Sequence, residues 1–483
     1  MTCSPRGLDA AAAPATPLPP DAEVRVYRRR WLLLGLFASV IALNAVPWLQ
    51  YCVIEDVVVR YYSVPEEVVE WTSLVFNVTA MLLAFPAAWL LGRHGLRTSV
   101  LVGAVGTALG MWLKVAGCWP DYFWVSLMGQ AVVSASTNFV INSPARFAAV
   151  WFPDNEVSMA LGAALFGQMA GFSVGSALAP LTARSSWSQE DIFWGFLQLN
   201  LSLAALATVL LVLVIWLFQD APPLPPSPAQ ASAKAAKASA DKSSSAQSLA
   251  SDQPLTPTAT SNFMASMRRI CTNLHFLLLL TSYTLLVAVF VAINTLLNRF
   301  VLEFFPDRGA DAGWLATLMT LTGMGGIAVV SAALDRTKWF KELCVAVYAG
   351  SLATCVMYTV VLGRSSIDMV YWAAAGMGMF MSSFFVAGLE MAAELTYPEP
   401  EGNPTSIVNW MFQPFSLVTT LVYARLFADF GADAANYFLC GLLALGLVAT
   451  MATPKKYMRL HAEVSSRGGE DAVKAPTAAP PPA

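Results

Sequence analysis

Four side chains with useful polar or aromatic chemistry stand inside long apolar stretches of this sequence. Trp48 follows Pro47 in one stretch, Tyr51 comes one helical turn later, and Gln168 and Gln413 lie within two others. An indole face attracts a quaternary ammonium by roughly 0.5–2 kcal/mol, and a proline opens a helix where it lines a cavity. These residues agree with a binding site for an organic cation but do not by themselves establish one. The alternatives are interface anchors for the two aromatic residues and ties between helices for the glutamines.

Two acidic side chains, Glu390 and Glu394, lie four residues apart, which places them on one face of a helix. An acid inside a membrane helix is a functional hypothesis by default, as part of a proton relay or of a salt-bridged gate. Arg146 occupies the related place in the first half of the chain and is a suitable partner for such a gate. The alternative is that both acids reach the headgroup region and are solvated. Asn294 and Thr137 are further polar residues in apolar stretches and are weaker candidates for the binding site.

The residue patterns of enzymes and of nucleic-acid-binding proteins do not occur in this sequence. The three histidines are not spaced for a metal site, and the seven cysteines contain no CxxC pair. No Gly-x-x-x-x-Gly-Lys-Ser/Thr loop for a nucleotide phosphate is present. The 28 basic and 31 acidic residues are spread over ends and loops, without a basic stripe for nucleic acid. We therefore expect no catalysis, no metal, no cofactor and no nucleic-acid partner.

The elements that position the candidate side chains follow from composition. Of the 483 residues, 57% are hydrophobic and only 12% are charged, about half the charge of a soluble globular protein. Runs of about 20 apolar residues predict helices that span a membrane. Twelve such runs occur, six on each side of a polar interval: Trp31–Ile54, Trp71–Leu91, Thr98–Gly117, Tyr122–Ser143, Val157–Leu181, Ile192–Phe218, Leu274–Phe300, Ala312–Leu334, Glu342–Leu362, Met369–Ala393, Pro404–Phe427 and Ala435–Ala452.

Basic residues gather on one side of these predicted spans, which the positive-inside rule assigns to the cytoplasm. We therefore expect a cytoplasmic head at 1–24, a six-helix half at 25–218, a linker at 219–265, a second half at 266–453 and a tail at 454–483, with both termini cytoplasmic. The head and the linker are rich in Pro, Ala and Ser and are predicted to be disordered. The expectation is a multi-pass monomer in the plasma membrane.

The two halves repeat each other at a nearly constant offset. The basic loop with Arg93 and Arg97 is matched 243 residues later by the loop with Asp335 and Arg336, and Gln168 is matched by Gln413 after 245 residues. Parallel six-helix halves are the architecture of major facilitator transporters. The two loops also resemble that superfamily's signature, Gly-x-x-x-Asp-Arg-x-Gly-Arg, which predicts a gating role for their charges. In the first copy Gly92 stands where the acid belongs. The alternative role of these arginines is positive-inside anchoring.

Four strings narrow the resemblance. They are Asn44–Tyr51, Pro144–Phe152, Asn294–Arg299 and Glu390–Glu399, of which the last is the most specific. They resemble the feline leukaemia virus subgroup C receptor-related family of the major facilitator superfamily, and the likeness extends from about Arg25 to Arg459.

The resemblance implies an all-α major facilitator fold of 12 transmembrane helices and a facilitative carrier of choline and ethanolamine, with haem export also attributed to the family. It also implies a choline site built from an aromatic box on helices 1 and 7 and glutamines on helices 4 and 11. Trp48 and Gln413 match two of these positions. The helix-7 aromatic falls on Val291 and the helix-4 glutamine falls on Thr137, so half of the box is changed.

Two classes of function follow from the sequence. The first is a carrier of a small organic solute by alternating access, and the second is a non-transporting membrane receptor or scaffold that uses the linker as its binding segment. Polar residues inside both halves favour the carrier, because a scaffold does not need a polar cavity. No acid lies in the middle of helices 1, 4 or 7, which favours a uniporter over a proton-coupled symporter.

Overall fold

In the computed structural model, the described residues are 25–153, 156–224, 226, 266–337, 339–363, 366–397, 399 and 402–455. The predicted disordered head, nearly all of the linker and most of the tail lie outside these ranges, so their predicted disorder is not addressed by the structure. The described part of the chain is helical and contains no β-strand.

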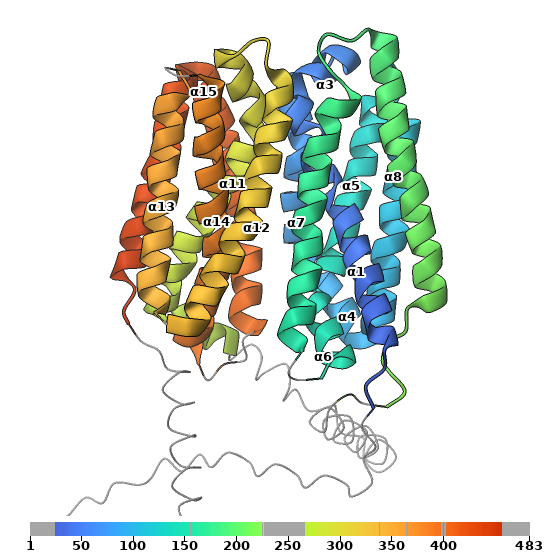
Figure 1. Ribbon diagram of the computed structural model, residues 1–483, viewed down its shortest axis with the longest axis vertical. Helices are drawn as coiled ribbons and strands as arrows, with labels where there is room; N and C mark the ends of the chain where they lie inside the picture. The colour runs from blue at the N-terminus through green and yellow to red at the C-terminus, as the bar shows by residue number, and fades with distance from the viewer. Residues whose placement is uncertain are drawn as a thin grey trace, which may run out of the picture.

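The first half of the chain packs as one bundle (Figure 1). Its helices are α1 (Arg29–Ala45), α2 (Pro47–Gln50), α3 (Glu55–Tyr62), α4 (Glu66–Ala116), α5 (Phe123–Ile141), α6 (Pro144–Trp151), α7 (Val157–Thr182) and α8 (Gln189–Leu217), with short 3-10 turns at Cys52–Ile54 and Pro120–Tyr122. The second half forms a second bundle beside it from α11 (Leu274–Phe304), α12 (Gly309–Thr337), α13 (Phe340–Val361), α14 (Ile367–Thr396) and α15 (Gly402–Ala452).

Ten helices in the described part of the chain are long and apolar enough to cross a membrane. Two of them, α4 and α15, have 51 residues each, and each contains two of the predicted spans. Each leaves helical geometry at one glycine with a positive φ, 89° at Gly95 and 83° at Gly431, a backbone conformation that glycine adopts without steric cost. The ten helices confirm a polytopic all-α membrane fold, and the count of twelve spans stays a prediction.

The first predicted span is broken rather than continuous. Helix α1 ends at Ala45, the four-residue α2 begins at Pro47, and a 3-10 turn precedes α3. Proline cannot donate the backbone hydrogen bond that would continue α1, so the break falls where the sequence places Pro47. The short segment after the break carries Trp48 and Gln50.

Close packing of α1 against α7 depends on glycine. Gly171 faces the Ala42 carbonyl oxygen so closely that a Cβ atom there would overlap it, and a Cβ on Gly167 would lie 2.8 Å from the Ala38 carbonyl oxygen. Small residues let membrane helices approach in this way, where dispersion rather than the hydrophobic effect holds them together. The contact fixes the broken helix against α7.

The two bundles have two ends, which we name by the chain. The linker end is where α8 ends at Leu217 and α11 begins at Leu274, and the far end is where α3 lies (Figure 1). One buried apolar cluster belongs to the first half alone, whereas the larger one joins the second half to far-end residues of the first, such as Val57, Phe123 and Phe196. The hydrophobic core therefore crosses between the halves at the far end.

Candidate functional site

An aromatic cluster surrounds the broken part of the first helix. The ring of Trp48 lies 4.6 Å from that of Phe172 on α7 and 6.5 Å from that of Phe76 on α4, measured between centroids. All three rings are partly buried, and the indole Nε1 of Trp48 has no hydrogen-bond partner. The sequence predicted Trp48 from its place after Pro47 and from its match to a family position, and Phe76 and Phe172 have neither signal.

Polar groups of the same half lie near this cluster along the helices. Thr137 donates from Oγ1 to Asn44 Oδ1 at 2.6 Å, and the Asn44 amide donates to Thr107 at 2.7 Å. Gln168 precedes Phe172 by four residues on α7, so the two share a helix face, and Asn44 lies at the end of α1 just before the break that precedes Trp48. Thr137 and Gln168 are both partly exposed. The hydroxyl of Thr137 is thus already engaged by Asn44, while the structure records no hydrogen bond for Gln168.

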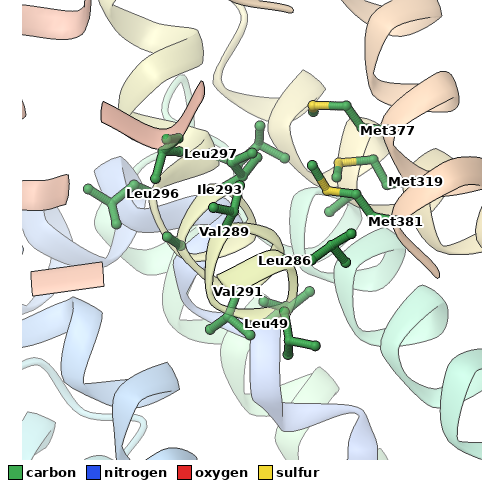
Figure 2. Close-up of a cluster of buried hydrophobic side chains, with 14 of the residues drawn as sticks. Leu49, Leu286, Val289, Val291, Ile293, Leu296, Leu297, Met319, Met377 and Met381 are labelled. Atoms are coloured by element: carbon green, nitrogen blue, oxygen red, sulfur yellow. The ribbon is translucent and has the colours of Figure 1, made fainter. Parts of the chain in front are cut away.

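The predicted site residues of the second half are aliphatic or carry amides. Val291 is buried and belongs to the same apolar cluster as Leu49, which follows Trp48 (Figure 2). Asn294, one turn further along α11, donates to the Phe290 carbonyl at 2.9 Å, while its buried Oδ1 has no partner. Gln413 is partly exposed and precedes Pro414 inside α15. Figure 2 shows aliphatic and methionine side chains around α11 at this level.

Tyr51 faces the interior of the first half. Its hydroxyl lies 2.8 Å from Ser126 Oγ, and its ring is fully buried against Phe196. The Lys114 ammonium lies 4.3 Å from the ring centroid. The aromatic face of Tyr51 therefore already holds a cation from the chain itself.

Lys114 is the polar residue that the sequence analysis passed over. It lies in the last turn of α4, fully buried, and donates to Gln50 Oε1 at 2.6 Å and to Gln130 Oε1 at 3.0 Å. A lysine within the predicted span Thr98–Gly117 was the available signal. A charged group in such a span faces the bundle interior and finds polar partners, as it does here.

A cluster of four charges joins the halves at the far end. Arg299 of α11 lies 2.8 Å from Glu55, 2.9 Å from Glu70 and 3.1 Å from Glu66, measured between guanidinium nitrogens and carboxylate oxygens. The Arg299, Glu55 and Glu70 side chains are each at most 10% exposed, whereas Glu66 is largely exposed. The sequence did not predict this cluster, because Glu55, Glu66 and Glu70 all lie between the predicted spans Trp31–Ile54 and Trp71–Leu91.

Neutral hydrogen bonds cross between the halves beside the charged cluster. Asn298 donates to the Val53 carbonyl at 3.2 Å and accepts from the Asp56 backbone N–H at 3.1 Å. Ser73 and Thr295 lie 3.1 Å apart through their hydroxyl oxygens. On another flank, the hydroxyls of Ser176 on α7 and Thr317 on α12 are also 3.1 Å apart. These contacts hold the molecule closed at its far end.

The predicted gating loop of the first half is completed by a residue from outside it. The Asp220 carboxylate accepts the Arg97 backbone N–H at 2.8 Å beside Gly95, and the Arg97 guanidinium donates to the Ile215 carbonyl at 3.1 Å. Arg93 is exposed, 5.7 Å from the Trp89 ring. An acid thus reaches this loop from just beyond α8, although the loop itself carries Gly92 in place of one.

The remaining gating candidates are spread over the linker end. Arg336 is exposed in the last turn of α12, and the side chain of Asp335 lies outside the described part of the structure. Arg146 donates to the Leu91 carbonyl within its own half. Glu390 is exposed and Glu394 is buried, and both take part in interactions. Among the described residues, no three His, Cys, Asp or Glu side chains gather to hold a metal ion.

Comparison with known proteins shows the family to which the chain belongs. The profile of the Major Facilitator Superfamily matches residues 32–413. The choline/ethanolamine transporter flvcr2a of Danio rerio is 32% identical over 450 residues, which cover 93% of this chain and 91% of that protein. Choline/ethanolamine transporter FLVCR2 of Homo sapiens is 33% identical over 88% of this chain and 77% of its own, and FLVCR1 of Felis catus is 32% identical over 93% and 76%.

Solved structures share the fold. An inward-facing bacterial homolog of the human lysosomal transporter Spinster aligns with a TM-score of 0.62 at 12% identity, covering 94% of this chain and all of that one. The fucose:proton symporter FucP of E. coli aligns with a TM-score of 0.59 at 14% identity, covering 89% of this chain and all of the other. These likenesses show a shared fold, which confirms the predicted fold class.

Proposed function

The chain belongs to the Major Facilitator Superfamily and, within it, to the feline leukaemia virus subgroup C receptor-related family; from this premise we propose that it is a facilitative carrier of choline and ethanolamine. The observation that supports this most is its similarity, over about nine-tenths of its length, to proteins named choline/ethanolamine transporters. The carrier works by alternating access between two bundles around a central site. It resides in the plasma membrane as a monomer with both termini in the cytoplasm.

The aromatic cluster supports an ammonium substrate. A quaternary ammonium has no N–H to donate, so its recognition depends on aromatic faces and dispersion. Trp48, Phe76 and Phe172 offer such faces from three helices, and all three rings are partly exposed. Thr137, Gln168, Asn294 and Gln413 are the polar groups that we assign to the rest of the substrate, and Val291 is an aliphatic wall in place of the family's second aromatic ring.

The far-end cluster supports the proposed cycle. Closure around Arg299 shuts the far end in this state. Opening to the other side requires Arg299 to leave Glu55 and Glu70. Charges at the linker end, from Arg93, Arg97, Arg146, Asp335, Arg336, Glu390 and Glu394, would close the opposite gate.

Uptake of labelled substrates tests the proposal. Cells with low endogenous choline uptake express the chain, and surface levels are measured in parallel. Choline and ethanolamine should accumulate above the vector control and compete with each other, whereas labelled haem should not. Export of haem without choline uptake would support the other activity attributed to the family. Absence of all three fluxes at normal surface expression would support the receptor or scaffold alternative.

A further inference from the structure

Lys114 is a fully buried basic side chain whose partners are all uncharged. Its side chain has no exposed surface, and no carboxylate pairs with it in the ranges that the structure describes. A charged group inside a protein is costly unless it is hydrogen-bonded, and one in a membrane helix marks a functional position by default. The structure satisfies Lys114 with three electron-rich partners: Gln50 Oε1, Gln130 Oε1 and the Tyr51 ring.

The ammonium fixes the orientation of two amide groups. An ammonium has three donors and no acceptor, so each glutamine must turn its oxygen to Lys114 and its nitrogen away. The Gln130 nitrogen then donates to the Pro47 carbonyl at 2.6 Å and to the Thr72 carbonyl at 3.0 Å. The Gln50 nitrogen lies 3.2 Å from Asn200 Oδ1 on α8. With either amide reversed, an N–H would meet the lysine and a carbonyl would be left unpaired.

This chain of contacts ends beside the aromatic cluster. Pro47 and Gln50 are the first and last residues of α2, and Trp48 lies between them. Gln130 holds the first residue through its carbonyl, and Lys114 holds the last through its side chain. We propose that Lys114 is a positioning residue for the substrate site, whose ammonium holds the broken segment of the first helix, and with it Trp48, in the geometry that binds the substrate.

The identity of the substrate in this inference rests on the proposed function, whereas the contacts of Lys114 do not depend on it. Lys114 does not touch the far-end cluster, so its loss should weaken substrate binding without slowing the conformational cycle. Methionine matches the length of lysine and its apolar packing but cannot orient the amides. Glutamine keeps an N–H donor without the charge. The two substitutions therefore separate packing from hydrogen bonding.

Uptake kinetics give the first test. Lys114→Met should raise the KM for choline about tenfold, the loss expected for a hydrogen bond to a charged group, with Vmax per surface transporter unchanged. Lys114→Gln should restore part of the difference, and Lys341→Met, at a partly exposed site on α13, should match the wild type. An unchanged KM in Lys114→Met would overturn the proposal. Failure of both Lys114 variants to reach the membrane would also overturn it, because the lysine would then serve folding.

A substrate-free measurement separates this proposal from the proposed function. Protein labelled with 5-fluorotryptophan and purified in nanodiscs gives a ¹⁹F resonance for Trp48, assigned by its disappearance in Trp48→Phe. Lys114→Met should shift that resonance, whereas Lys341→Met should not. If the wild type transports no choline but Lys114→Met still shifts the Trp48 resonance, the proposed substrate is wrong and the positioning role stands. An unshifted Trp48 resonance would overturn the positioning role whatever the protein transports.

Discussion

At the scale of single residues, Trp48 and Tyr51 show how the same residue class takes two roles three positions apart. Trp48 packs against the rings of Phe76 and Phe172 and leaves its indole N–H without a partner, whereas Tyr51 is hydrogen-bonded and already faces the Lys114 amine. A ring that holds an internal cation is not free for another. We therefore assign substrate recognition to Trp48, and regard Tyr51 as part of the support beneath it.

The Trp48 assignment predicts a graded loss of choline uptake. Trp48→Phe should keep part of the affinity, because phenylalanine is a weaker but still aromatic face, and Trp48→Leu should lose more although it keeps apolar area. The expected gap is about 1 kcal/mol, or several-fold in KM. KM is measured by initial-rate uptake at matched surface levels, with Trp216→Leu as the control, since Trp216 is 80% exposed on α8.

Equal KM values for Trp48→Phe and Trp48→Leu would contradict the cation–π role. Trp48 would then serve packing against Phe172, and the changed positions Thr137 and Val291 would indicate a substrate other than choline.

Sequence reasoning reached this site only in part. Trp48 and Gln413 were predicted because their chemistry is unusual in an apolar helix, or because family positions match. The roles of Phe76, Phe172 and Lys114 depend on which helices become neighbours, and a period or a motif does not contain that information. The carboxylates of Glu55 and Glu70 look like loop acids in sequence, but the second half of the chain buries them.

At the scale of elements, hydrophobic run length predicted where the helices lie, and Pro47 predicted the break in the first one. The same reasoning did not predict that the two spans within α4, and the two within α15, are joined at a single glycine with almost no loop between them. A join that needs only one residue with a positive φ does not require a run of turn-forming residues, so the amino-acid composition around it changes little.

The contact between α1 and α7 predicts a position-specific effect of alanine. Gly171→Ala places a methyl group on the Ala42 carbonyl oxygen, whereas Gly162→Ala, in the same helix, meets no atom within 4 Å. Gly171→Ala should destabilise the protein by roughly 1–3 kcal/mol through overpacking. Thermal unfolding of the two purified variants in detergent checks this. Equal unfolding temperatures would show that α1 and α7 move apart without a loss of stability.

The far-end cluster predicts a shift between conformations. Removing one partner of a buried ion pair costs about 3–5 kcal/mol, because the other charges stay desolvated. Opening the far end exposes Glu55 and Glu70 to water, so Arg299→Gln should favour the open state. Arg308→Gln, which removes the ion pair between the largely exposed Arg308 and Asp311 near the same end, should have little effect.

Thiol labelling from outside the cell measures that shift. A cysteine at Ser73, which is buried opposite Thr295 when the far end is closed, should react faster with an impermeant reagent in the Arg299→Gln background. The same labelling rate in the Arg299→Gln, Arg308→Gln and parent backgrounds would mean that the charged cluster does not control the far end.

At the scale of the whole molecule, the repeat of the two halves predicted the architecture, but the linker was predicted to be disordered from end to end. The structure shows that its second residue, Asp220, binds the loop that contains Arg97. Replacing Pro222–Thr260 by a Gly/Ser chain of equal length should therefore leave choline uptake near normal. Asp220→Ala should lower stability by about 1 kcal/mol, the usual value of a lost cap. Loss of uptake by the Gly/Ser variant at normal surface expression would assign a transport role to the linker.

Energy coupling is a property of the whole cycle, and the charge distribution predicts that no proton gradient drives it. The aromatic cluster contains no acid, Glu390 and Glu394 lie towards the linker end, and the buried acids of the far end share Arg299. A cation carried alone responds to its own gradient and to membrane potential. Choline uptake with and without a protonophore, at a potential clamped by potassium and valinomycin, should agree.

A collapse of uptake on adding the protonophore would assign a proton to one of these acids, and the variants would identify it. Glu55→Gln or Glu70→Gln would then remove the response if the far-end cluster is the relay. Glu394→Gln would remove it if the relay is at the linker end. Under the uniport mechanism none of the three substitutions changes the protonophore response, because each acid only closes a gate. The far-end pair would then affect the rate of uptake but not its driving force.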